Sequence, residues 1–201
     1  MGLFDKLFGG GRTEEVSSKR LSEPEAVQLF FYTKNKELDD QWDDLLKALR
    51  RDERRAELLK DLDESKAKLD LMLAAVAVDL IALDNLFPPG RAERLNQITL
   101  KSFPEEFREY ANEAISEYCT QFKEALSSGL NPMQSMGEIF FGRWGLAGDE
   151  YPPPVGQVFI PRNQLAAMAL TSALCAFLGG WKRINDTFEI VEGEGSFDIV
   201  D

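Results

Sequence analysis

The chain has 201 residues, of which 44% are hydrophobic, as in an ordinary globular domain with a sizeable core. It contains no histidine, which excludes the usual serine and cysteine catalytic triads and most zinc sites. The formal net charge is −12 and no basic stripe runs along the sequence, so nucleic-acid binding is not expected.

The first eleven residues form a short amphipathic segment, which we call the tip (residues 1–11). Four large apolar side chains have a helical spacing that places them on one face: Leu3, Phe4, Leu7 and Phe8. Three glycines, residues 9–11, separate them from the rest of the chain. A two-turn helix is unstable alone in water. The tip is therefore expected to be disordered or to dock on a membrane surface, a protein partner or the body of this chain.

No targeting signal is recognised at this end of the sequence. The tip lacks the long apolar run and the cleavage site of a secretory signal, and Lys6 stands where a myristoylation motif requires Ser or Thr. The two cysteines, Cys119 and Cys175, lie in apolar runs and are expected to be buried thiols in a reducing compartment. We therefore expect a cytoplasmic protein, with membrane association through the tip.

The first helix of the body is predicted to begin at Glu23, because residues 22–25 combine the spacing of a capping box with a proline in the first turn. It is expected to end near Thr33. A second helix, from Lys36 to Leu59, is indicated by apolar residues spaced three and four apart, with charged residues on its other faces.

The next predicted helix, residues 64–86, is apolar nearly all round, which is typical of a helix at the centre of a core or in a membrane. Asp70, Asp79 and Asp84 interrupt it, and each carboxylate would cost about 2.5–3.5 kcal/mol near the centre of a bilayer. A second apolar run, residues 165–181, has only the minimum length for a span. Both runs are predicted to be buried helices of a soluble core.

A short helix is expected over residues 91–100, and the cap signals around it predict two more. Residues 102–105 have the capping-box spacing, which predicts the start of a long amphipathic helix that Gly129 ends. Residues 131–132, an asparagine followed by a proline, predict the start of the next helix.

The last helix is expected from Pro161 to about Trp181. Residues 184–201 then contain six acidic residues and no basic one, so half of the net charge of −12 lies in this segment. Two short runs in which apolar residues alternate with other residues lie on either side of a glycine-rich turn. This pattern favours a weak hairpin or a flexible acidic tail that binds a partner. The side chains expected to contact that partner are Phe188, Ile190, Phe197 and Ile199.

Two acidic patterns resemble metal-binding motifs. Residues 39–43 have the DDxxD spacing, which is similar to the magnesium-diphosphate motif of prenyl-transfer enzymes, where carboxylates on one helical face share a hard cation. Residues 37–40 and 61–64 carry paired carboxylates that resemble those of all-α nucleotide pyrophosphohydrolases, which activate water without histidine. Solvated acidic helix faces explain both patterns more simply, so no metal or cofactor is expected.

Together these features predict an all-α fold, a single-domain bundle of five to seven helices. We divide the chain into the tip (residues 1–11), a helical domain (residues 12–183) and an acidic tail (residues 184–201). The favoured function is that of a non-enzymatic adaptor or scaffold, which the tip attaches to a membrane surface or larger assembly and which binds a protein partner. Two alternatives stay open: an acidic inhibitor or immunity-type protein that covers a basic partner, and a magnesium-dependent enzyme acting on a diphosphate-containing substrate.

Overall fold

A computed structural model of the chain describes residues 19–51, 53–144 and 164–193. These residues are mostly helical, which confirms the all-α prediction. The elements, in chain order, are β1 (Lys19–Ser22), α2 (Glu23–Leu49), α3 (Glu53–Leu58), α4 (Glu64–Leu86), α5 (Pro89–Lys101), α6 (Glu105–Ser127), α7 (Pro132–Arg143), α8 (Gln164–Ala176), α9 (Gly180–Thr187) and β2 (Phe188–Val191).

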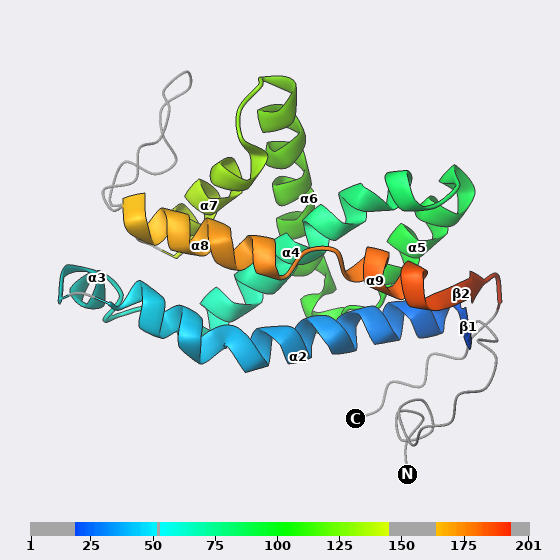
Figure 1. Cartoon of the computed structure of the whole chain (residues 1–201), viewed down its shortest axis with the longest axis horizontal. Coiled ribbons are helices and arrows are strands. Elements are labelled where there is room, and N and C mark those ends of the chain that lie inside the picture. The colour runs from blue at the N-terminus through cyan, green and yellow to red at the C-terminus, as the bar shows by residue number, and fades with distance from the viewer. Residues whose placement is uncertain (1–18, 52, 145–163, 194–201) are drawn as a thin grey trace, which may run out of the picture.

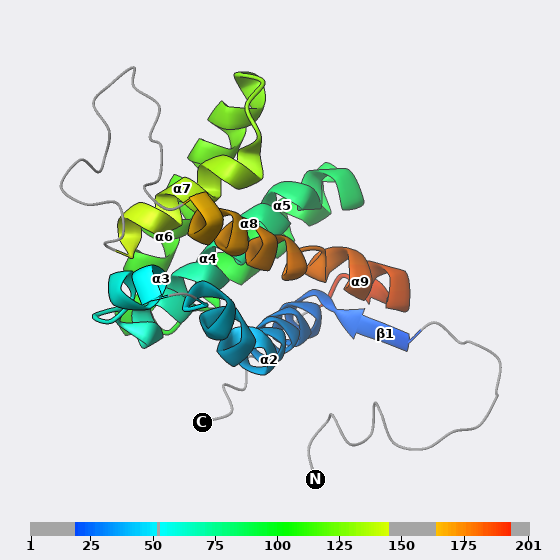
Figure 2. The ribbon, with the colours of Figure 1, turned by 60° about the vertical axis from the view of Figure 1, so that its left-hand side comes forward.

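Helix α4 is the central helix of the body (Figure 1). It contacts α2, α5, α6, α7, α8 and α9, and it is buried over most of its circumference, as expected of a helix that is apolar nearly all round. Helix α2 runs side by side with α8 and α9, and α7 packs against both α8 and α6 (Figures 1 and 2). Among the described helices, none combines the length and the apolar character that crossing a bilayer requires.

The region predicted as two helices, residues 23–33 and 36–59, is instead one long helix, α2, followed by the short α3. Ser22 caps α2 as predicted, because its side chain accepts a hydrogen bond from Glu25 N and its own N–H donates to the Glu25 carboxylate at 2.8 Å. No helix-breaking residue lies between Thr33 and Lys36, and the intervening Lys34 is buried. The helix therefore continues through the predicted break.

The two cap predictions around α6 have different outcomes. Ser102 does not begin a helix but ends α5, where its hydroxyl donates to the carbonyl of Ile98 at 2.8 Å. Helix α6 begins after Pro104 without a side-chain cap. Its predicted end is confirmed, since Gly129, directly after the C-cap, has a φ of 70°. Glycine adopts this left-handed conformation without steric cost.

The predicted last helix, residues 161–181, is divided into α8 and α9. Gly179 causes the division, because its φ of 81° is incompatible with a continuous right-handed helix. Helix α9 begins anew at Gly180 and places Trp181 and Ile184 in the core.

Strand β2 corrects the predicted boundary of the acidic tail. It pairs with β1 in parallel, with Lys19 opposite Phe188 and Ser22 opposite Val191, so residues 184–191 belong to the body. Phe188 and Ile190 are buried rather than presented to a partner, because alternate residues of a strand share a face and this face packs on the core. The partner of β2 is β1, and the proposed second half of the hairpin, with Phe197 and Ile199, lies outside the described residues.

A buried salt bridge joins α2, α4 and the turn between α8 and α9. Lys34 Nζ lies 2.6 Å from Asp79 Oδ2, and the two side chains are 1% and 2% exposed. Asp79 also accepts hydrogen bonds from Gly179 N at 2.8 Å and Gly180 N at 3.2 Å, while Lys34 donates to the carbonyl of Phe177. Burial lowers the pKa of Lys34, and the Asp79 carboxylate opposes that shift. Both charges are thus compensated within the core.

The aromatic contacts beside this salt bridge require a glycine in α9. The indole of Trp181 stacks on the ring of Phe30, with a centroid distance of 4.7 Å. A Cβ atom at Gly180 would lie 2.8 Å from the Phe30 ring and 2.9 Å from the Lys34 side chain. Position 180 therefore has no room for a side chain while α2 and α9 stay in contact.

We expect Gly180→Ala to lower the free energy of unfolding by about 1–3 kcal/mol, the usual cost of overpacking a filled core. Gly90→Ala is the matched control, because Gly90 is exposed in α5 and a Cβ atom there has 3.8 Å to its nearest neighbour. The control should be neutral or slightly stabilising. Urea unfolding of both variants measures the difference, and equal stabilities would contradict the close packing of α2 on α9.

A second prediction concerns the charges themselves. Asp79→Asn should cost about 3–5 kcal/mol of unfolding free energy, because it leaves the Lys34 ammonium buried without a counter-charge. Adding Lys34→Met should recover part of that loss, since this junction then contains no unpaired buried charge. Asp186→Asn, which breaks the exposed pair with Lys182, should change stability by less than about 0.5 kcal/mol. A double variant that is no more stable than Asp79→Asn alone would show that the two charges are not coupled.

Candidate functional site

The residues predicted to contact a membrane or partner are mostly outside the described part of the chain. Phe188 and Ile190 are described and buried, as reported above. The others lie in the segments that the structure does not describe: Leu3, Phe4, Leu7, Phe8, Phe197 and Ile199. The tip therefore stays a prediction from the sequence, and the site is sought in the body.

Three carboxylates of the two acidic patterns lie next to cations. Asp39 is paired with Lys68, and Glu64 is 2.7 Å from Arg50 Nη2. Glu37, at the start of the paired-carboxylate pattern, is 2.6 Å from Arg183 Nη2. Within the described residues, no three His, Cys, Asp or Glu side chains are grouped closely enough to hold a metal ion.

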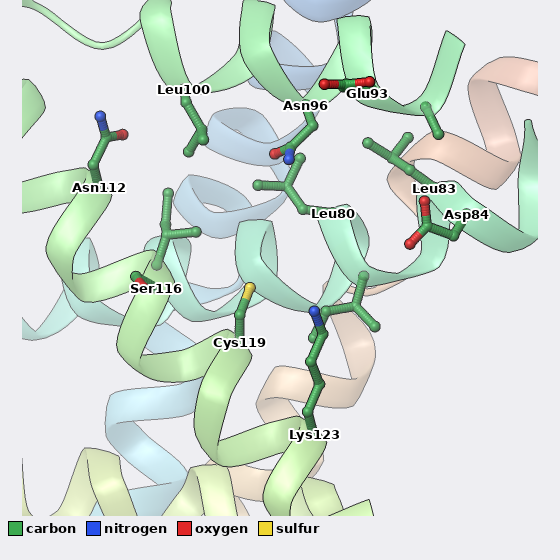
Figure 3. A pocket seen from close by; sticks show the side chains of 13 residues that line it. Leu80, Leu83, Asp84, Glu93, Asn96, Leu100, Asn112, Ser116, Cys119 and Lys123 are labelled. Atoms are coloured by element: carbon green, nitrogen blue, oxygen red, sulfur yellow. The ribbon is translucent and has the colours of Figure 1, made fainter. Parts of the chain in front are cut away.

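The body has a groove between α4, α5 and α6, with a volume of about 420 Å³. Its apolar part is contributed by all three helices, and Leu80, Leu83, Ala92 and Ile115 are almost completely buried there. Figure 3 shows Leu80 and Asn96 approaching each other across the groove, and Cys119 and Lys123 reaching into it from α6. A volume of this size is in the range of protein sites that bind small molecules or anchoring side chains.

The groove also has polar groups that the body does not satisfy. Asn112 Oδ1 is buried and has no hydrogen-bond partner in the described structure. Among the described residues, Lys123 makes no salt bridge, and the exposed Asp84 lies at the α4 end of the groove. An apolar floor with a few unsatisfied polar groups around it is the usual composition of a binding site.

The two cysteines differ from the sequence prediction of buried thiols. Cys175 is exposed, because it lies on the outer face of α8, and Cys119 is half-buried in the groove. Cys119 Sγ lies 3.6 Å from the carbonyl of Ala77, and burial raises the pKa of its thiol. A thiol with a raised pKa is a weak nucleophile at neutral pH, so Cys119 is not favoured as a catalytic group.

A second polar cluster lies where α4 meets α6 and α7. Asp70 is fully buried, and its Oδ1 accepts a hydrogen bond from the Tyr110 hydroxyl at 3.0 Å. Arg143 Nη1 lies 3.6 Å from the same oxygen, and the Arg143 guanidinium also donates to Glu117 and lies over the ring of Tyr118. This cluster ties three helices together through one carboxylate and one guanidinium.

The charge of Asp70 is less well compensated than that of Asp79. Asp70 Oδ2, Arg143 Nε and the Tyr118 hydroxyl have no hydrogen-bond partner among the described residues. Burial raises the pKa of Asp70, although the Tyr110 hydroxyl and the Arg143 charge both lower it. Burial also raises the pKa of both tyrosines, so neither phenol can act as a base at neutral pH.

Neither the groove nor the Asp70 cluster was expected from the sequence. The sequence feature that indicated such contacts is the presence of three aspartates in an otherwise apolar helix. A carboxylate on a buried helix face requires a cation or hydrogen-bond donors. That signal identifies α4 as the helix that carries buried polar groups. It does not identify Lys34 or Arg143 as their partners, since these residues lie far along the chain.

Comparisons with protein-family models, with curated proteins and with solved structures found no match to this chain.

The raised pKa of Asp70 predicts a pH dependence of stability that Asp70→Asn should remove. A carboxyl whose folded-state pKa is raised binds a proton more tightly in the folded state than in the unfolded state. Its stabilising contribution is therefore complete below the ordinary value of 3.8 and is lost as the pH rises through the folded-state pKa. We expect the unfolding free energy of the wild type, relative to Asp70→Asn, to fall across that window in urea titrations. A constant difference from pH 3 upward would contradict the assignment, pH 3 being about one unit below that ordinary value.

Proposed function

We propose that the protein is a non-enzymatic helical adaptor whose tip attaches it to a membrane surface or a larger assembly. The body supplies a helical frame, and the chain on either side of it supplies the attachments. The salt bridges of Asp39, Glu37 and Glu64 favour this proposal over a magnesium-dependent enzyme, because carboxylates next to cations are poorer ligands for a further cation.

The observation that carries the proposal is the parallel pairing of β1 with β2. It brings the start of the first described segment and the end of the last one to the same edge of the body (Figure 1). The paired segment is four residues long, so the points where residues 1–18 and 194–201 join the body are only about 10–15 Å apart at 3.3 Å per residue. Both attachments therefore act from one edge.

That edge is fastened to the body by ion pairs. Arg20 and Glu189 bridge the two strands at 2.8 Å. The buried Glu23, at the start of α2, accepts three hydrogen bonds from Arg94 of α5, at 2.8, 2.9 and 3.2 Å. Glu192 lies 3.4 Å from the same guanidinium. A bidentate carboxylate–arginine pair fixes orientation as well as distance. The strand edge is thereby fixed relative to α2 and α5.

The attachment should be weak and reversible. Burying the four large apolar side chains of the tip contributes roughly 4–8 kcal/mol, after a discount for partial burial at an interface. Ordering about ten residues opposes this by a comparable amount. Lys6 adds only a small attraction to anionic lipid, so one tip alone gives a short-lived contact.

Replacing Phe4 and Phe8 with Ser should reduce sedimentation with phosphatidylcholine–phosphatidylserine vesicles, or with the native assembly, while leaving the melting temperature almost unchanged. The matched control is Leu126→Ser with Leu130→Ser, two apolar side chains that are exposed on the body. The control should keep vesicle binding. A tip variant that melts much lower and binds vesicles like the wild type would show that the tip belongs to the core instead.

A further inference from the structure

The groove between α4, α5 and α6 has the features of a site for an amphipathic segment. Its floor is apolar, with the nearly buried side chains of Leu80, Leu83 and Ile115 beneath it. Two of its polar groups can bind a partner. Asn112 Oδ1 is an unsatisfied hydrogen-bond acceptor, and Lys123 is an ammonium without a salt bridge in the described structure. A partner that offers both donors and acceptors would satisfy them. A short helix that inserts apolar side chains and presents polar ones at the rim fits such a groove.

The groove lies one helix away from the edge where the flanking segments join the body. On α5, Arg94 faces that edge through its bonds to Glu23 and Glu192. The neighbouring Glu93 and Asn96 of the same helix line the groove. A helix with its side chains is about 10–12 Å across, so the two sites are separated by roughly that distance.

The chain before β1 is long enough to reach the groove. Ten residues, 9–18, separate the apolar side chains of the tip from Lys19, where β1 begins. Fully extended, they span up to about 33–36 Å, several times the width of α5. The glycines at residues 9–11 allow the tip to take the orientation that the groove requires.

We propose that this groove binds the tip of the same chain, with Leu3, Phe4, Leu7 and Phe8 on its apolar floor. The inference depends on the amphipathic tip of the proposed function and adds an internal site for it. The other flanking segment is a poorer occupant, because residues 194–201 carry three carboxylates and no base, while Asp84 and Glu93 already make the rim acidic. The tip carries Lys6 as well as Asp5 and meets no such repulsion.

Internal docking makes groove occupancy and surface attachment mutually exclusive, because the same four side chains serve both. A tether of this length gives an effective concentration in the millimolar range. Against a groove affinity of roughly 0.1–1 mM, the tip would be docked between about half and nine-tenths of the time. Attachment to an outside surface then has to compete with the groove.

Cys119 allows the occupancy of the groove to be measured. In a Cys175→Ser background, which removes the exposed thiol, we expect Phe4→Ser with Phe8→Ser to increase the rate of Cys119 alkylation by iodoacetamide about two- to tenfold at alkaline pH. Leu126→Ser with Leu130→Ser should leave the rate unchanged. Millimolar peptide with the sequence of residues 1–11 should restore protection to the tip variant. The proposal is overturned if Cys119 is alkylated at the same rate in all variants, or in none of them.

A second measurement fills the groove instead of changing the tip. Ser116 is exposed and lines the groove, so Ser116→Trp should block it and release the tip. Vesicle affinity should then rise by about the same two- to tenfold factor. Thr120→Trp, one turn further along α6 and outside the groove, is the matched control and should have no effect.

The two experiments separate the failure of this inference from the failure of the proposed function. Vesicle binding that needs Phe4 and Phe8, together with Cys119 alkylation that is independent of them, overturns internal docking and keeps the adaptor. Cys119 protection that depends on the tip, without vesicle or assembly binding by any variant, supports internal docking and overturns external attachment. An unchanged vesicle affinity in Ser116→Trp, in a chain that does bind vesicles, also overturns internal docking.

Discussion

The salt bridge between Lys34 and Asp79 is the contact on which the arrangement of the body depends. It lies where α2, α4 and the α8–α9 turn meet, and it is closed to solvent on all sides. A buried charge without a partner is costly, so each of these two residues requires the other to be in place. The backbone donors of Gly179 and Gly180 complete the coordination of the carboxylate, which also explains why α9 begins at this point. Three features next to the salt bridge belong to the same junction. Gly179 has a left-handed conformation, position 180 has no room for a side chain, and Trp181 stacks on Phe30.

Helix α4 carries a second buried carboxylate, and the contrast between the two is informative. Asp79 has a cation and two backbone donors, whereas Asp70 has one phenol and a more distant guanidinium, and its Oδ2 has no partner among the described residues. Burial raises the pKa of Asp70, so this carboxyl is easier to protonate than an exposed one. At the junction of α4 with α6 and α7, the raised pKa of Asp70 therefore couples the stability of the core to pH.

Helix α5 connects the edge formed by β1 and β2 to the groove between α4, α5 and α6. Arg94 holds the strand edge through Glu23, and the residues beside it on α5 form a wall of the groove. The ten residues between the tip and β1 are long enough for the proposed docking of the tip in this groove. A short amphipathic segment that is unstable alone is suited to such an exchange, because neither contact has to be strong.

The sequence by itself was sufficient for the helical fold, for the start of α2 at the Ser22 capping box and for the end of α6 at Gly129, because caps and apolar spacing are local properties. It also marked α4 as the central helix. Tertiary packing decided the rest. Helix α2 continues through residues 33–36, and α9 and β2 pack on the body. Phe188 and Ile190 are buried because β2 pairs with β1, a strand from the other end of the chain. The partners of Asp79 and Asp70, and the groove between α4, α5 and α6, come from segments far apart in sequence. Local periodicity carries no information about which distant residues will meet, so only the folded structure could place them.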